Sequence, residues 1–485
     1  MSKIVILGAG IAGHTAASHL RRKLGKEHEV LVVSPNSNYQ WVPSNIWVGV
    51  GRMKPKEVIF PLAPLYKKKG IGYKQAKAVS FHPEGDMQEN APYVIAEYVV
   101  GENKGKQEKI TYDYLINATG PRLAFDQTEG LNPGENNMYS VCTYGHAEHA
   151  AQGLKELEEK LKNSDKKLKI LIGTGHPKAT CQGAAFEYIL NVENELRRKG
   201  LRDKAEITWI SNEYDLGDFG MDGMLLSYKG LRMKSSEMVE MVFEDRGIRW
   251  ILKAGVTKVE PGKVYYETLD GEYKVEEYDF GMLIPAFAGH PFKAYDKNGE
   301  DITPKLFRGF MVVDADYSEK SYEKWTVQDW PETYQNPHYQ NIYAPGIAFA
   351  PPHSILKPRT SKNGNPIFPA PPRTGMPSGI TAKLVADNII DEIKGIKSSI
   401  HKGSMGNMGA ACIASAGFGL TKGSAVSITT FPIVPDYEKY SKTGGRDIRK
   451  TFGEIGLAGH WVKYALHIGF LWKAKMKPFW WLIPE

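Results

Sequence analysis

The stretch that decides the fold reads Ile4-Val5-Ile6-Leu7-Gly8-Ala9-Gly10-Ile11-Ala12-Gly13. An apolar, β-branched run that leads directly into a GxGxxG turn predicts a buried parallel strand followed by a tight turn. We expect a helix over residues 15–24 and a second strand over residues 30–33. Together these elements give the strand–turn–helix–strand context that a dinucleotide-binding turn requires.

The three glycines have different roles in such a turn. Gly8 permits the tight turn, Gly10 lets the backbone approach a pyrophosphate, and Gly13 lets helix and strand pack closely. The phosphates would lie at the N-terminus of the helix. The acidic residue that usually bonds the ribose after the second strand is missing. Ser34 or Asn36 could bond a hydroxyl there, or both could be turn residues only.

A later segment indicates which dinucleotide binds. Residues 114–121 form an expected strand that ends in an Ala118-Thr119-Gly120 turn. This turn resembles the segment with which two-dinucleotide flavoproteins approach FAD a second time. We therefore expect FAD, with Thr119 and Gly120 among its contacts.

A second glycine turn, at residues 173–178, follows an expected strand over residues 169–172. Its third glycine position holds Lys178, whose side chain we expect to obstruct helix–strand packing, and Pro177 stiffens the turn. We predict that this unit keeps the fold and has lost its phosphate site. The alternative is an NAD site with atypical glycines. Cys181 starts the next expected helix, where the thiolate is favoured, although an isolated cysteine is by default a small buried hydrophobe.

Composition excludes several classes of protein. The 485 residues have a net charge of +7 and ordinary hydrophobic content, which excludes wholesale disorder. Three widely spaced cysteines form neither a disulfide framework nor a zinc motif. No apolar run approaches the length of a membrane-spanning helix.

Several ordered segments give the sequence a specific resemblance over essentially the whole chain. It resembles the sulfide:quinone oxidoreductases and the related flavoprotein subunit of flavocytochrome c sulfide dehydrogenase. The segments that carry this resemblance are residues 39–48, 140–147, 181–187, 341–348, 372–375 and 408–412, and three of them contain one cysteine each.

The resemblance implies roles for individual side chains. Cys181 and Cys412 would be the redox pair beside the flavin, and Cys142 would also lie near it. His146 and Glu187 match positions that handle protons in the family, although either could be only solvated or structural.

The resemblance also implies further cofactor contacts. Gly346 lies in the stretch where most flavoprotein relatives have Gly-Asp, and Arg373 replaces the family's lysine near the flavin. A cation there would stabilise the reduced, anionic flavin.

The C-terminal part of the sequence suggests a membrane surface and a quinone. Residues 457–472 place apolar side chains at helical spacing, and a Phe479-Trp480-Trp481 cluster follows, which predicts an interfacial helix. Docking on the core or a dimer interface is the alternative. The family holds its quinone against aromatic rings, and Phe452, followed by Phe418 and Phe431, is the best candidate by position; core packing is the alternative for each.

We therefore predict an α/β fold with two Rossmann-like units and a C-terminal α-helical membrane-anchoring region. The predicted division is residues 1–165 with 275–375 for FAD, 166–274 for the degenerate unit and 376–485 for the C-terminal domain. The expected function is FAD-dependent sulfide oxidation with a membrane quinone as acceptor. We expect a peripheral membrane protein and homo-oligomer that binds a lipid surface, without metal or nucleic acid. The rivals are a flavocytochrome c type dehydrogenase, a type II NADH:quinone oxidoreductase and a flavin-holding membrane protein without turnover.

Overall fold

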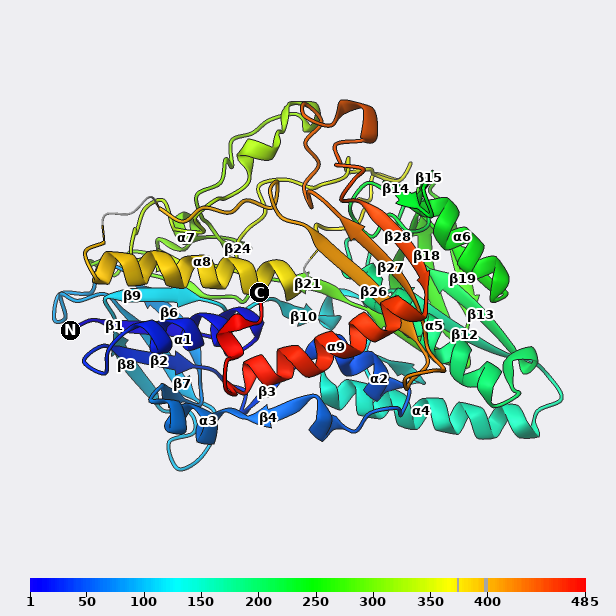
Figure 1. The fold of residues 1–485 in the computed structure, drawn as a ribbon, viewed down its shortest axis with the longest axis horizontal. Helices are drawn as coiled ribbons and strands as arrows, with labels where there is room; N and C mark the ends of the chain where they lie inside the picture. Colours follow the sequence, from blue (N-terminus) through cyan, green and yellow to red (C-terminus); the bar gives the residue numbers. More distant parts are fainter. Residues whose placement is uncertain (373–374, 397–399) are drawn as a thin grey trace.

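A computed structural model describes residues 1–372, 375–396 and 400–485. Its first parallel sheet has the strand order β25-β9-β1-β2-β5. The strands are β1 (Lys3–Leu7), β2 (Glu29–Val33), β5 (Gly72–Lys74), β9 (Tyr114–Asn117) and β25 (Ile342–Tyr343). Helix α1 (Ile11–Lys23) packs against α8 (Gly375–Ile393) beside this sheet (Figure 1). The predicted strand–turn–helix–strand unit is present, with α1 starting directly after Gly10.

A second parallel sheet repeats this architecture, with the strand order β11-β20-β12-β13-β16. Its strands are β11 (Met138–Tyr139), β12 (Leu168–Thr174), β13 (Ala205–Ile210), β16 (Ile248–Ile251) and β20 (Phe280–Ile284). Its helices are α4 (Tyr144–Asn163), α5 (Gln182–Arg198) and α6 (Ser235–Asp245). Because β20 pairs with β12, the chain is still in this second unit after residue 275, the predicted boundary. The division into domains stays a proposal.

The C-terminal region combines the helices α8 and α9 (Leu457–Ala474) with a sheet that the prediction of an α-helical region did not include. A third sheet has the order β15-β14-β28-β27-β26. It contains β14 (Leu225–Tyr228), β15 (Leu231–Lys234), β26 (Ala410–Ala416), β27 (Ser424–Thr430) and β28 (Phe452–Gly456). Strand β26 consists mostly of small residues, and β27 combines small residues with Val426, Ile428, Thr429 and Thr430, which are β-branched and favour a strand. Helix α9 lies on β26 and β27 and runs toward α1 (Figure 1).

Smaller elements complete the fold. The helices are α2 (Asn45–Gly49), α3 (Leu62–Lys69) and α7 (Thr303–Leu306). The remaining strands are β3 (Asn38–Gln40), β4 (Ile59–Pro61), β6 (Ala76–His82), β7 (Tyr93–Tyr98), β8 (Gln107–Thr111), β10 (Arg122–Ala124), β17 (Ala254–Glu260), β18 (Lys263–Thr268), β19 (Tyr273–Glu277), β21 (Ala286–Ala288), β22 (Lys293–Ala294), β23 (Phe307–Arg308) and β24 (Phe310–Met311).

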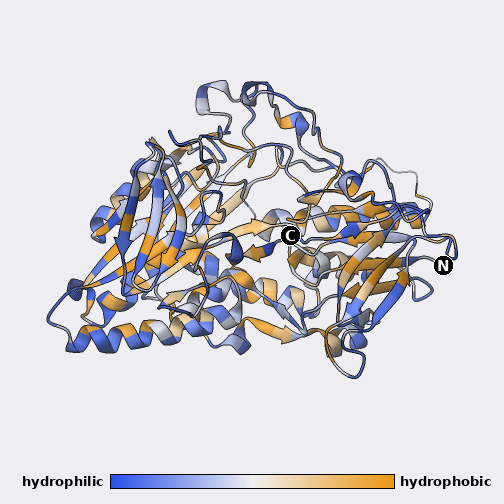
Figure 2. Cartoon of the chain, turned by 180° about the vertical axis from the view of Figure 1, so that it is seen from behind, coloured by the Kyte–Doolittle hydropathy of each residue, from blue (hydrophilic) through white to orange (hydrophobic). Residues whose placement is uncertain are grey.

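Burial follows the expected pattern for parallel sheets. The side chains of Ile4, Val5, Ile6 and Leu7 on β1 are fully buried, because helices and loops cover both faces of the sheet. Figure 2 shows mostly hydrophobic strands inside the molecule and a largely hydrophilic α4 at its edge. Within the described residues, no helix is long and apolar enough to span a bilayer.

Candidate functional site

The turn between β1 and α1 leaves room for a ligand only where a phosphate is expected. Gly8 has a φ of +97°, and a methyl group there would lie 2.3 Å from the Ala118 carbonyl oxygen. A methyl group on Gly13 would lie 2.1 Å from the Gly8 oxygen, so both positions require glycine. At Gly10, by contrast, no atom of the described residues lies within 4 Å of an added methyl group. Gly10 caps α1 without a side-chain hydrogen bond, so the helix N-terminus presents backbone N–H groups to an anion.

The residues predicted to bond the ribose lie at the end of β2. Ser34 is buried, and its hydroxyl accepts a hydrogen bond of 3.3 Å from the Asn36 backbone N–H. Asn36 is exposed, and its carbonyl accepts from the Tyr73 hydroxyl. Ser34 therefore helps to shape the turn, and Asn36 is the more accessible of the two.

Two further loops approach the β1–α1 turn. The Thr119 hydroxyl donates to Asn117 Oδ1 at 2.8 Å, and Gly120 follows in a left-handed conformation. Gly346 has a φ of +75°, and a methyl group there would lie 2.8 Å from the Ala12 side chain. Its backbone N–H donates to Thr381 Oγ1 on α8. Arg373 lies outside the described residues, two positions before α8 begins.

The start of α5 meets the strand that carries Cys412. Cys181 is the N-cap of α5 and has a left-handed backbone with φ of 68°. Two residues later, a methyl group on Gly183 would lie 2.8 Å from Cys412 Sγ on β26. The fold thus brings the Cys181 and Cys412 segments together, as the resemblance implies. Burial, and secondarily the charge of Glu187, raises the pKa of Cys412 to about 11.

Glu187 lies in the same place and is paired with a cation. Its Oε2 is 2.9 Å from Lys463 Nζ of α9, and its Oε1 accepts from the Ser415 backbone N–H at 3.2 Å. The Glu187 and Lys463 side chains are only 6% and 12% exposed. Burial raises the pKa of Glu187, while Lys463 and the Ser415 N–H oppose that rise. The role of Lys463 could not be predicted from the sequence, because the pair joins residues 276 positions apart.

Cys142 and His146 share the segment that leads into α4. The Cys142 backbone N–H donates to Ser140 Oγ, and burial raises the pKa of the thiol to about 11. The His146 backbone N–H donates to the N-cap residue Thr143, and its ring packs edge-on against Phe125. Burial lowers the pKa of His146, and its buried Nδ1 has no hydrogen-bond partner in the part of the chain that the structure describes. A neutral imidazole with an unused ring nitrogen can take up or release a proton.

Other parts of the chain pack against the second glycine turn, although not in the way that the sequence predicted. The Lys178 side chain is exposed, so the prediction that it obstructs helix–strand packing is wrong. Instead, Asn212 bonds the carbonyls of Pro177 and Ala179, and Gln182 bonds Asn212. These hydrogen bonds tie down residues 177–179, which separate the turn from the start of α5 at Gln182.

The proline-rich segment before residue 373 lies over this turn. The Phe368 backbone N–H donates to the Pro177 carbonyl, and the Ala370 N–H donates to that of Ala179. The Thr180 hydroxyl donates to the Pro371 carbonyl at 3.0 Å, directly beside Cys181. Residues 368–371 therefore lie across the second turn.

Glu213 is a further acid that the sequence did not indicate. It follows β13, is buried, and accepts hydrogen bonds from Ser211 Oγ and the Phe219 backbone N–H. Burial and the neighbouring Asp218 raise the pKa of Glu213. Glu213 also helps to raise the pKa of Cys412, so its carboxyl lies near the sulfur site.

An apolar cavity of about 150 Å³ lies on the other side of β26. Elements α1, α8, β26 and α9 surround it, and its lining includes Trp41, Ala411, Ile413, Leu466 and Phe470. Ala411 and Ile413 flank Cys412, so alternation along the strand places them on the opposite face from the thiol.

The three predicted quinone-contacting rings lie elsewhere. Phe452 on β28 is 43% exposed, and the Lys450 ammonium lies 4.3 Å from the centre of the Phe431 ring. Phe418 packs edge-on against Trp47 and Tyr464. None of the three is among the residues that line the cavity.

Helix α9 buries polar side chains and exposes apolar ones, which is the reverse of an ordinary surface helix. His460 and His467 face inward, bonding Ser415 and Ser44 respectively, whereas Trp461, Ile468 and Trp472 are about half exposed. The predicted apolar face is therefore split, because Leu471, one of its members, is buried. Of the aromatic cluster that follows, Trp480 is buried against His19, while Phe479 is 66% exposed.

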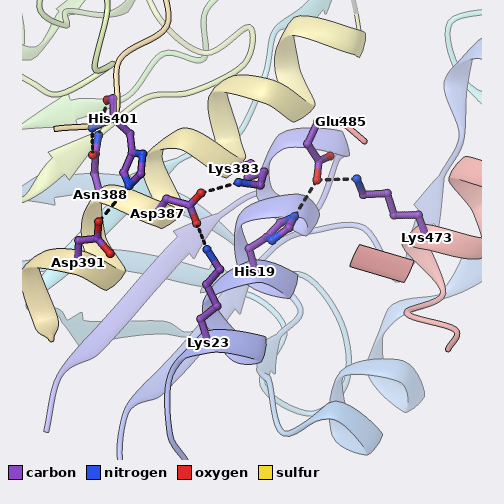
Figure 3. A network of polar contacts seen from close by, with 9 residues as sticks. All are labelled: His19, Lys23, Lys383, Asp387, Asn388, Asp391, His401, Lys473 and Glu485. Carbon is purple, nitrogen blue, oxygen red and sulfur yellow. Dashed lines mark hydrogen bonds and ion pairs between the residues drawn. The ribbon is translucent and has the colours of Figure 1, made fainter. Parts of the chain in front are cut away.

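A buried ionic contact holds the end of the chain against α1. Glu485 Oε1 lies 2.7 Å from His19 Nε2 and 2.6 Å from Lys473 Nζ (Figure 3). All three side chains are at most 7% exposed. Asp387 of α8 binds Lys23 of α1 beside this contact. The last turn of α9 is therefore fixed to the first Rossmann-like unit.

Comparison with known proteins gives consistent similarities. Residues 2–176 match the family model for pyridine nucleotide-disulphide oxidoreductases. The sulfide-quinone reductase of Aquifex aeolicus is 29% identical over 97% of this chain and 91% of that protein. The crystal structure of the sulfide:quinone oxidoreductase from Aquifex aeolicus has a TM-score of 0.74, with 27% identity, and covers 98% of this chain and 92% of the other. An NDH2 structure from Plasmodium falciparum has a TM-score of 0.62 at 14% identity, covers 98% of this chain and 96% of its own, and shares the fold alone. The predicted family resemblance is confirmed.

Proposed function

We propose that this chain, which matches the sulfide:quinone oxidoreductases over almost its whole length, is an FAD-dependent enzyme that oxidises hydrogen sulfide and reduces a quinone. The observation that carries the proposal is the meeting of the Cys181 and Cys412 segments at Gly183. Two thiols from distant parts of a flavoprotein fold have no structural need to converge. The segments that carry them meet here beside a buried acid–base pair, Glu187 and Lys463.

The first glycine turn fits FAD. Gly8 and Gly13 allow the close approach of backbone, Gly10 leaves open space, and the α1 N-terminus favours a pyrophosphate. Beyond the pyrophosphate, the cofactor would be bordered by Thr119, Gly120 and Gly346. Asn36 would lie near the ribose. Bound FAD would accept an electron pair from the sulfur site and release it to the quinone.

The cysteine pair accounts for the sulfur chemistry. Hydrosulfide attacks a sulfur bridge between Cys181 and Cys412, which leaves one cysteine as a persulfide and the other as a thiolate. Re-forming the bridge releases two electrons, and the added sulfur leaves at the zero-valent level or lengthens a polysulfide. Because the pKa of the Cys412 thiol is about 11, a thiol formed there needs a base at neutral pH, and Glu187 is placed to be that base.

The closed second turn argues against NADH as the electron donor. Asn212 and Gln182 tie down the residues that follow the turn, and residues 368–371 lie across it. An NADH:quinone oxidoreductase with the same fold would need this turn open. The whole-length similarity to sulfide-quinone reductase favours the same conclusion.

We assign the quinone ring to the apolar cavity behind β26. Its volume of about 150 Å³ matches that of a cavity that holds one benzene ring, so the head group fits and an isoprenoid tail must leave along α9. Phe452, Phe418 and Phe431 do not line the cavity and remain candidates for the path of the tail only.

We further infer that α9 faces a lipid surface. Its outward side chains, Trp461, Ile468 and Trp472, continue into Phe479 and Leu482, all 46–71% exposed. An apolar outer stripe over a polar inner face fits an interfacial helix that lies in the plane of a bilayer. The protein would then bind peripherally to the membrane, with the cavity close to the bilayer in which the quinone dissolves. Homo-oligomerisation stays a prediction.

An anaerobic titration tests the function. Sulfide is added to the FAD-loaded protein and the flavin absorbance is followed, and the same is done separately with NADH. We expect bleaching by sulfide, recovery on adding a short-chain quinone, and no bleaching by NADH. Bleaching by NADH alone would assign the protein to the NADH:quinone class instead.

A further inference from the structure

The cation next to Glu187 comes from an element that has no other part in the sulfur site. Helix α9 is seated on the third sheet by His460, which bonds Ser415 and the Gly419 carbonyl. One turn further along, Lys463 extends from α9 to Glu187 Oε2 and to the Ile413 carbonyl at 3.3 Å. Lys463 also lines the apolar cavity. A single side chain thus connects both faces of β26.

We propose that Lys463 is a positioning residue of the sulfur reaction: fixed by α9, its ammonium keeps the Glu187 carboxylate charged beside Cys412, ready to accept the thiol proton. In that step the S–H bond breaks, an O–H bond forms on Glu187, and no electrons are transferred. The electron pair leaves only when the sulfur bridge re-forms. This inference rests on the proposed function and adds to it the residue that sets the charge of its base.

The charges around Glu187 support this role. Burial raises the pKa of the Glu187 carboxyl, because desolvation disfavours the charged form. Cys412 of β26 and Glu213 beyond β13 are acids on the same side and do not compensate a negative charge. The pKa of His460 on α9 is lowered by burial. Of these neighbours, Lys463 alone is a basic side chain that forms an ion pair with Glu187.

The test compares Lys463→Met, which keeps the length of the side chain, with Lys463→Arg, which keeps the charge. The rate of flavin reduction by sulfide is measured anaerobically by stopped flow from pH 5.5 to 9.5. Removing the charge raises the pKa of Glu187, so the acidic limb of the profile should move up by about 1–3 pH units in Lys463→Met. Lys463→Arg should keep the limb near its original position. An unmoved limb in Lys463→Met refutes the proposal, even if the rate falls.

A second measurement separates this proposal from the function itself. The pH dependence of Cys412 alkylation by iodoacetamide, read by mass spectrometry, needs no sulfide turnover. Lys463 lowers and Glu187 raises the pKa of Cys412, so Lys463→Met should shift the midpoint up and Glu187→Gln should shift it down. Equal midpoints in all three proteins refute the charge coupling. If Lys463→Met fails to fold, the same alkylation midpoints are measured for Lys463→Gln, which should shift up, and for Glu187→Gln, which should shift down. Absence of bleaching by sulfide in the unmodified enzyme, with the alkylation shifts present, would refute only the proposed function.

Discussion

Adding one methyl group at Gly183 tests the central contact of the site. The new carbon would lie 2.8 Å from Cys412 Sγ, about 0.6 Å inside the ordinary contact range that begins at 3.4 Å. Cys412 cannot retreat freely, because β26 is paired along its length with β27. The thiol must therefore turn or shift by roughly half an ångström or more. A misplacement of about 1 Å at a reacting atom costs on the order of 100-fold in rate.

We expect Gly183→Ala to slow anaerobic flavin reduction by sulfide about 10- to 100-fold, a barrier increase of about 1.4–2.7 kcal/mol. The FAD content should stay unchanged, because the change lies far along the chain from the β1–α1 turn. Gly469→Ala in α9 is a matched control, a helical glycine with nothing within 4 Å of the added group. If Gly183→Ala reduces its flavin as fast as Gly469→Ala does, Cys412 does not act from the position seen here.

Three further changes test other parts of the argument. Burial raises the pKa of Glu213, so the folded protein holds a proton that the unfolded chain releases, and the melting temperature should fall as the pH rises from about 4. Glu213→Gln should make this fall less steep and should raise the melting temperature at pH 9. Replacing both Trp461 and Trp472 by Ser should weaken binding to anionic lipid vesicles at least about tenfold in a sedimentation assay, a loss of about 1.4 kcal/mol, whereas Tyr273→Ser, an exposed aromatic of β19, should leave binding unchanged. Lys473→Met leaves the carboxylate of Glu485 buried, with His19 as its remaining ionic partner among the described residues. It should lower the unfolding free energy by about 3 kcal/mol in denaturant titration; a loss below 1 kcal/mol would mean that this contact is not tightly held (Figure 3).

Local sequence was a reliable guide wherever the chain's own neighbours determine the structure. The β1–turn–α1 unit follows from an apolar run and from two glycines that no other residue can replace. A methyl group added at Gly8 or Gly13 would clash with a backbone oxygen. The start of α9 at Leu457 follows in the same way from apolar spacing. These features depend on contacts within a few residues or on one strand pairing.

Features that depend on distant contacts could not be read from the sequence. Lys178 has the wrong side chain for a glycine position, yet it turns outward, and the turn is closed by Asn212 and by residues 368–371. The orientation of α9 was equally hidden, because apolar side chains lie on both of its faces. The inward hydrogen bonds of His460 and His467 show which face points outward.

Strand β26 explains how one short segment can serve two substrates. Successive side chains along a strand point to opposite faces, so Cys412 meets α5 while Ala411 and Ile413 border the apolar cavity. A hydrophilic sulfur anion and an apolar quinone can then be kept apart, although their sites are separated by the thickness of one strand. A site built on a helix would lack this alternation, because neighbours on a helix diverge by only about 100°. The same geometry makes Lys463 unusual, since it extends past the strand edge and joins the two compartments that the strand divides.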